Sequence, residues 1–311
     1  MHALPVHRCV ALLESLTGAA PSVGFAHGTI KQAAAAMEEA DNRIRTLITL
    51  AYAVCCDETP IRVGPRKPRE GRRKADEYLL VACTEFYTWY MLGDRDLPTF
   101  TAFILADLTG VVVHDRYVLY DHPEVGDLIH QLCCQHILRD LEDAAQTYPD
   151  AHWPVQIQDT LRGLIHQANL ARDAGDQAVP AHLTDRLISR FRHGVRVGLS
   201  QVRRIPGPQA RTKQPVGRVL LEVLRDREDD VLRFVGDLRV PPTSHQAERD
   251  VRPAKTQQNT SGRLTSEART RDRYRIRGVL CTAAKHGLDQ LKVIRDALTG
   301  RSWIPPLPAP T

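Results

Sequence analysis

The sequence predicts a mixed α/β fold, and three observations support this class. The apolar run 51–56 and the VVVHD segment at 111–115 are short, and each leads into an aspartate, which is typical of buried strands. Between them, the β-branched and aromatic segments 78–84 and 86–93 predict a hairpin. Helix formers then dominate 124–203. This order of elements predicts a mixed sheet with helices packed on it.

The first 50 residues are predicted to be helical, with PSVGFAHG as a turn region. KQAAAAMEEADNRIRTLI is rich in strong helix formers and carries a rough apolar stripe. The run 51–56 is read as a strand that ends at Asp57, although periodicity alone leaves a helix open. The basic segment 62–74 contains Pro65, Pro68 and Gly71 and is predicted to be a loop.

Further along the chain, LPTFTAFILADLTG predicts a helix from Leu97 to about Gly110. The helical pattern of 124–203 is followed by a proline-rich loop at 205–215 and then by one more helix, VGRVLLEVLRDREDDVLRFVGDL. The last functional helix begins near Thr243, whose spacing to Gln246 fits a capping box. Pro253 predicts a break or kink at the residue before it.

Length and composition are those of a globular protein without a membrane segment. The chain has 311 residues, of which 42% are hydrophobic and 25% are charged, and no apolar run approaches the length of a membrane helix. The N-terminus lacks the pattern of a signal peptide, so we expect a cytoplasmic protein. Seven cysteines, with two adjacent pairs in apolar stretches, argue against a disulfide framework and are expected to be mostly buried.

The net charge is only +5, but the positive charge is concentrated in two segments. Residues 62–74 hold seven Arg or Lys and one Glu, and residues 249–277 hold nine Arg or Lys against three acids. Such clusters suit a polyanion. An ordinary solvated surface rich in arginine is the alternative for either segment taken alone.

Three acidic residues are the candidates for chemistry. Asp57 and Asp115 follow the two apolar runs, and Glu248 lies in the first turn of the last helix, where the helix dipole favours an anion. Carboxylates can hold divalent cations, and a pair of cations can catalyse phosphoryl transfer. Taken singly, each acid is better explained without a metal, Asp57 and Asp115 as turn residues and Glu248 as a first-turn acid paired with Arg252; their joint occurrence favours the metal site. Glu58 is secondary, because neighbouring strand residues point to opposite faces.

A second group, Cys134 and His136 with His130 and Cys133 nearby, has no zinc-site spacing. Cys134 and His136 do not share a helix face, which favours structural roles. The sequence contains no glycine-rich phosphate loop, no G-x-S-x-G and no H-E-x-x-H.

Four segments carry a resemblance to a known family. CDETPIRVG, GVVVHDRYVLY, CCQHILRDLED and TSHQAERDVRPAKTQQNTSGRLTSE resemble the catalytic region of insertion sequence 66 transposases of the TnpC type, over roughly residues 1–290. The resemblance implies a DDE enzyme with a ribonuclease-H-like mixed-sheet core and a large helical insertion before the last catalytic acid. Ser244 and His245 stand where the family usually has paired asparagines.

The resemblance also implies a domain division. An N-terminal helical segment at 1–50 precedes the first part of the core at 51–140. The helical insertion follows at 141–240, then the last part of the core with the glutamate helix at 241–290, and a C-terminal tail at 291–311.

The site residues follow from the same resemblance. Asp57, Asp115 and Glu248 would be the catalytic and metal-binding acids, holding two Mg²⁺ ions for which Mn²⁺ can substitute. DNA contacts are expected from Arg249, Arg252, Lys255, Arg72, Arg73 and Lys74. A role for Cys134 and His136 is not implied.

The implied function is DNA strand cleavage and transfer in transposition. The expected partners are double-stranded DNA at the element ends and target, further copies of the chain on DNA, and helper proteins, with no membrane. Because the chain begins near the catalytic region, the alternative is a truncated, catalytically inactive DNA-binding remnant or regulator of the element.

Overall fold

The computed structural model describes residues 4–64, 76–207 and 213–307. Strands and helices are both present, which confirms the mixed α/β class. The chain forms two compact units. Unit 1 comprises residues 1–110, 118–128 and 245–311, and unit 2 comprises residues 111–117 and 129–244.

Unit 1 is built on three antiparallel strands, β1 (Ala53–Arg62), β2 (Asp76–Cys83) and β3 (Thr88–Gly93). β2 and β3 form the predicted hairpin, and β1 pairs with β2 in a register that places Asp57 opposite Val81. Residues 79–82 of β2 are fully buried. Both faces of this part of the strand are therefore covered, which explains why its residues 79–83 are continuously apolar.

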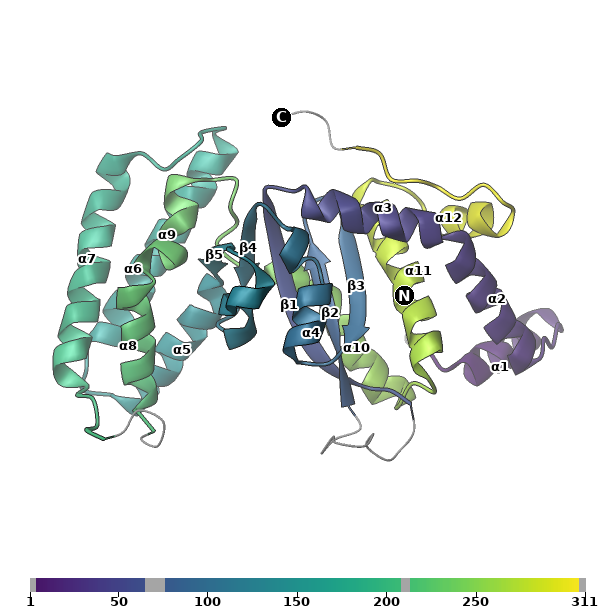
Figure 1. Ribbon diagram of the computed structural model, residues 1–311, viewed down its shortest axis with the longest axis horizontal. Coiled ribbons are helices and arrows are strands. Elements are labelled where there is room, and N and C mark those ends of the chain that lie inside the picture. The colour runs from purple at the N-terminus through teal and green to yellow at the C-terminus, as the bar shows by residue number, and fades with distance from the viewer. Residues whose placement is uncertain (1–3, 65–75, 208–212, 308–311) are drawn as a thin grey trace. The chain divides into compact units, whose positions relative to one another are not determined.

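Helices of unit 1 pack on these strands (Figure 1). α10 (His245–Ser261) contacts β1 and β2, and α11 (Glu267–Lys285) contacts β3. α2 (Val23–Ala36) and α3 (Glu38–Thr49) contact α11 in turn. The other α-helices of unit 1 are α1 (Val6–Thr17), α4 (Leu97–Ala102) and α12 (Gln290–Leu298).

The prediction that the first 50 residues are helical is confirmed by α1, α2 and α3. The predicted turn region is wrong in part, because α2 begins at Val23. The Ser22 side chain accepts a hydrogen bond of 3.0 Å from the Phe25 amide, which caps this helix one residue before its start.

Unit 2 contains the parallel strands β4 (Val111–His114) and β5 (Ile129–Leu132) and a group of helices. The helices are α5 (Cys134–Thr147), α6 (Trp153–Asp173), α7 (Ala181–Gln201), α8 (Val216–Asp226) and α9 (Glu228–Gly236). Their core is centred on the fully buried Trp153, Phe191 and Phe234. The buried amide of Gln131 joins β5 to α9, donating to the Val231 carbonyl at 3.0 Å and accepting from the Phe234 amide at 3.1 Å.

Two strand predictions need correction. Asp57 does not end its strand, since β1 stays paired with β2 as far as Arg62. Pairing along a whole strand outweighs the local turn tendency of Asp and Pro. The region from residue 124 was predicted to be helical, but 129–132 form β5, because four residues are too few to show a period that separates a strand from a helix.

Three helix predictions also change. The helix from Leu97 ends at Ala102, and a short 3₁₀ turn at Leu105–Asp107 follows. The single helix predicted at 216–238 is two helices that meet at Arg227, whose φ of −121° and ψ of 33° lie outside the helical region. Pro253 does not end α10, which continues to Ser261. The loop predicted at 62–74 lies largely outside the described residues, and its first residues belong to β1 and a bridge at Val63.

Five of the seven cysteines are buried, as expected, and all seven are free thiols. Among the helices that the structure describes, none has the length and apolar character that crossing a bilayer requires.

Asp41 of α3 gives unit 1 a predicted pH dependence. Its side chain is 14% exposed. Burial raises the pKa of Asp41 to about 6, although a hydrogen bond from Trp89 and the charge of Arg275 oppose the shift. A folded-state pKa above the unfolded one means that the folded state binds the proton more tightly. Stability is therefore lost as pH rises from about 4 to about 6, by roughly 3 kcal/mol at most.

We expect Asp41→Asn to remove this loss. The variant should be more stable than the wild type at pH 7, by up to about 3 kcal/mol, and the advantage should largely vanish at pH 4. Urea unfolding at both pH values measures it. Asp185→Asn, at an exposed site on α7, is the matched control and should change neither value. An advantage of Asp41→Asn that is the same at both pH values would contradict the prediction.

Candidate functional site

Unit 1 carries two of the three candidate acids on elements that pack together. Asp57 lies half-buried on β1, and its Oδ1 accepts the Glu58 backbone amide at 2.9 Å. Glu248 lies half-buried in the first turn of α10, as predicted. Because α10 contacts β1, unit 1 places both carboxylates on one pair of packed elements.

Glu58, the neighbour of Asp57, has a different environment. Its side chain is only 3% exposed and accepts two hydrogen bonds from Arg95, at 2.7 and 3.1 Å. The Tyr120 hydroxyl donates a further hydrogen bond at 3.2 Å. These contacts give Glu58 a structural role in unit 1, which agrees with its secondary place in the prediction.

Asp115 directly follows β4 in unit 2, as predicted. Its Oδ1 accepts the Tyr117 backbone amide at 2.8 Å, so a local turn orients the carboxylate. Arg116, between them, forms an ion pair with Asp140 of α5. Asp115 is half-buried, and the structure gives its position within unit 2 only.

The buried His114, which directly precedes Asp115, pairs with the half-buried His130. His114 Nε2 and His130 Nδ1 are 3.0 Å apart across β4 and β5. Burial lowers the pKa of His114, and the charges of His130 and Arg227 lower it further, so the ring is neutral at physiological pH. One nitrogen therefore donates to the other and links the two strands.

The cysteine–histidine segment at the start of α5 is arranged differently from the pair that the sequence singled out. Cys134 is fully buried, and its thiol lies 3.7 Å from the Val231 carbonyl. His136 instead forms a hydrogen bond with Cys133, whose sulfur also accepts the Ser244 amide at 3.3 Å. Burial raises the pKa of the Cys133 thiol, but these hydrogen bonds outweigh it and the net shift is downward.

A comparison with protein families decides the identity of the chain. The model of the IS66 transposase family matches residues 1–271. The chain belongs to the IS66 transposase family. No curated protein and no solved structure shows significant similarity to it.

Membership of the IS66 family indicates that the protein functions in DNA transposition and that DNA is its partner. DDE transposases generally use a divalent metal ion, and carboxylate oxygens are suitable ligands for one. The family match confirms the resemblance found in the four segments, all of which lie within the matched residues.

The basic residues that the resemblance implied fall into two groups. Arg249, Arg252 and Lys255 are exposed on α10 of this IS66 transposase. Arg72, Arg73 and Lys74 lie outside the residues that the structure describes. Only the first group can therefore be placed on the fold.

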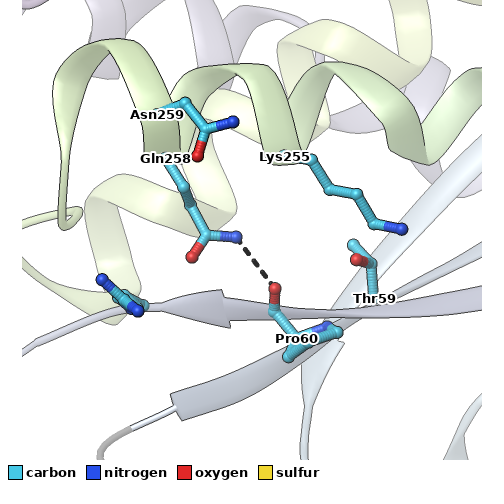
Figure 2. Close-up of a pocket in the computed structure, with 6 residues that line it drawn as sticks. Thr59, Pro60, Lys255, Gln258 and Asn259 are labelled. Atoms are coloured by element: carbon cyan, nitrogen blue, oxygen red, sulfur yellow. Dashed lines mark hydrogen bonds between the residues drawn. The ribbon is translucent and has the colours of Figure 1, made fainter.

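A groove between the second half of α10 and the last residues of β1 was not expected (Figure 2). Its volume is about 360 Å³, and it is lined by Thr59, Pro60, Arg62, Lys255, Gln258 and Asn259. We call it the β1–α10 groove. The sequence had indicated Lys255 as a basic residue of the last helix and Arg62 as part of the basic segment 62–74. It had not indicated the groove itself, because the groove depends on packing between segments about 200 residues apart.

Proposed function

We propose that this IS66 family transposase cleaves DNA strands and joins them to target DNA, using Asp57, Asp115 and Glu248 as its catalytic acids. The placement of Asp57 on β1 and Glu248 on α10, packed within unit 1, is the observation that carries the proposal. The place of Asp115 in the set rests on the H-D-x-Y segment of the sequence.

We further propose a ribonuclease-H-like core. Three features support it: β1, β2 and β3 pair antiparallel in chain order, β4 and β5 form a parallel pair, and α10, later in the chain, carries the last acid. The helices between β5 and α10 would then be the insertion that the resemblance implies.

The proposed acids fit a divalent metal ion by their chemistry. All three offer carboxylate oxygens, which Mg²⁺ and Mn²⁺ prefer. Asp57 and Asp115 are each oriented by a backbone amide, which fixes the carboxylate before any ion arrives. When bound, two ions would supply an activated water or 3′-hydroxyl and stabilise the leaving oxygen.

The basic face of α10 would hold the DNA backbone. Arg249, Arg252 and Lys255 are exposed on the helix that carries Glu248, so phosphates bound there would lie next to the proposed acids. Contacts of this kind position the strand without reading its sequence, and binding that depends on them weakens steeply with salt.

Incubation with DNA carrying the element ends tests the proposal. With Mg²⁺, we expect strand cleavage at the ends and joining of the new 3′-hydroxyl to a target duplex, and with EDTA neither product. Cleavage without joined products would indicate a nuclease of the same fold that lacks strand transfer. Salt-sensitive binding without any cleavage would favour the alternative of an inactive DNA-binding protein.

A further inference from the structure

The β1–α10 groove contains a polar group without a partner. Thr59 is 1% exposed, and its hydroxyl makes no hydrogen bond to any residue that the structure describes. Figure 2 shows its side chain pointing from β1 toward α10, beside Lys255. A buried hydroxyl left unsatisfied costs roughly 1–3 kcal/mol, so a group that regularly occupies the groove would explain why it is tolerated.

The groove is positively charged on both sides. Arg62 on β1 and Lys255 on α10 are exposed, and neither forms an ion pair with an acidic side chain that the structure describes. None of the lining residues is acidic. Two such cations facing one groove favour an anionic ligand such as a phosphate.

The rest of the lining can recognise more than a phosphate. Gln258 donates to the Pro60 carbonyl at 2.9 Å, which fixes its amide and directs its oxygen as an acceptor. Asn259 is exposed at the rim, and its amide offers both a donor and an acceptor. Amides of this kind pair with the edges of bases.

The groove continues the face of α10 that carries the proposed catalytic acid. Glu248, Arg252, Lys255 and Asn259 follow one another at spacings of four, three and four residues, which places them along one side of the helix. At about 1.5 Å per residue, the groove begins roughly 10 Å from Glu248 along the axis. A strand held at Glu248 could therefore extend into it.

We propose that the β1–α10 groove holds one unpaired nucleotide of the DNA strand, with its phosphate at Arg62 and Lys255 and its sugar and base at Thr59, Gln258 and Asn259. The inference rests on the proposed function and adds a preference for unpaired DNA beside the cleaved position. The groove volume of about 360 Å³ lies near the lower end of the range for ligand pockets, roughly 300 to 1,000 Å³, so it suits a single small ligand. A double helix keeps its base edges paired and could offer this groove only phosphate.

Fluorescence anisotropy in EDTA tests the binding without cleavage. The probes are a blunt duplex, the same duplex with a short single-stranded tail, and that duplex with an abasic tail. We expect the wild-type chain to bind the tailed duplex about tenfold more tightly than the blunt one. Thr59→Val and Asn259→Ala should each reduce that preference to about twofold while keeping blunt-duplex affinity.

Thermal unfolding separates recognition from folding. Thr59→Val removes a hydroxyl without a partner, so its melting temperature should be equal to or above that of the wild type. Thr256→Val makes the same change at an exposed threonine of α10 outside the groove and should leave the preference intact.

Three outcomes would overturn the proposal. The wild type could bind tailed and blunt duplexes equally, or Thr59→Val could retain the full preference. The abasic tail could bind as well as the intact one and be displaced by inorganic phosphate, which would reduce the groove to a phosphate site. A tail preference in a chain that never cleaves DNA would reject the proposed function and leave the groove assignment in place.

Discussion

Replacing Asp57 by asparagine is expected to abolish Mg²⁺-dependent cleavage of end-containing DNA while leaving salt-sensitive DNA binding in place. Asparagine keeps the shape of the side chain and can still accept the Glu58 amide, so the loss should come from the missing charge. Replacing a residue that only supports a metal ligand typically lowers metal affinity or activity by roughly 10–100-fold. Replacing a ligand itself should therefore lower the cleavage rate by more than about 100-fold. Gel assays of cleavage and anisotropy on the same DNA measure both quantities.

Glu58→Gln is the matched control for Asp57→Asn, because it removes one carboxylate charge from the adjacent residue. Glu58 is held by Arg95 and Tyr120, so its replacement should lower the melting temperature. Cleavage per folded molecule should remain within about threefold of the wild type. If Glu58→Gln abolished cleavage and Asp57→Asn did not, Glu58 would be the catalytic acid and Asp57 the structural one.

The same substitution logic applies to Asp115→Asn and Glu248→Gln. Each should lose cleavage and keep DNA binding, as Asp57→Asn does. Asp115 belongs to unit 2, so its behaviour tests whether an acid of that unit joins those of unit 1 during the reaction. Retained cleavage in either variant would remove that residue from the proposed set.

The sequence predicted those helices and strands whose residue patterns are continuous along the chain and extend over many residues. The hairpin of β2 and β3 has β-branched and aromatic residues on both strands, and the helices of unit 2 have sustained apolar periodicity. Glu248 was placed in the first turn of its helix because capping residues mark where a helix begins.

The errors occurred where tertiary pairing overrode local chemistry. Asp57 and Pro60 are turn-forming residues, yet both pair with β2 in the middle of a strand. β5 has only four residues, too few to show the alternation of a strand, and only its pairing with β4 defines it as one. Neither result could be read from residues adjacent in the chain.

The site was predicted in part for the same reason. The three acids and the basic residues of α10 came from motif resemblance, and their catalytic roles stay a prediction. Thr59 became a candidate only through its lack of a partner in a groove that β1 and α10 form together. Cys133, rather than Cys134, proved to be the partner of His136 because it lies at the N-cap of α5, beside Ser244.

A buried polar network fastens α10 to the rest of unit 1 and is expected to dominate the stability of this helix. Asp250 is 8% exposed and accepts hydrogen bonds from the Thr88 hydroxyl at 2.9 Å and from Gln246 at 3.1 Å. Lys285 of α11 lies 3.7 Å from the same carboxylate. The Asp250 backbone carbonyl accepts the Tyr90 hydroxyl at 2.9 Å. One residue thereby joins α10 to β3 and α11.

Asp250→Ala should destabilise the protein by roughly 3–5 kcal/mol, because it leaves the buried Thr88 hydroxyl without an acceptor and removes the carboxylate charge that faces Lys285. Lys285 would then keep only the backbone carbonyls of residues 84 and 87 as partners. Asp250→Asn keeps the shape and the acceptor, so its cost should be nearer 1 kcal/mol. Urea unfolding measures both values, and a double-mutant cycle of Asp250→Asn with Thr88→Val isolates the hydrogen bond between them. The exposed Asp185→Ala on α7 is the control and should stay within about 0.5 kcal/mol.

The expected consequence extends to catalysis. Glu248 lies two residues before Asp250, a rotation of roughly 200° around the helix, so fixing one side of α10 sets the direction of the other. Asp250→Asn should therefore lower the cleavage rate at temperatures where the protein is still folded, and the Mg²⁺ concentration needed for half-maximal rate should rise. An unchanged Mg²⁺ dependence would show that Asp250 stabilises α10 without positioning Glu248. A loss of stability below about 1 kcal/mol in Asp250→Ala would show that the network does not hold the helix at all.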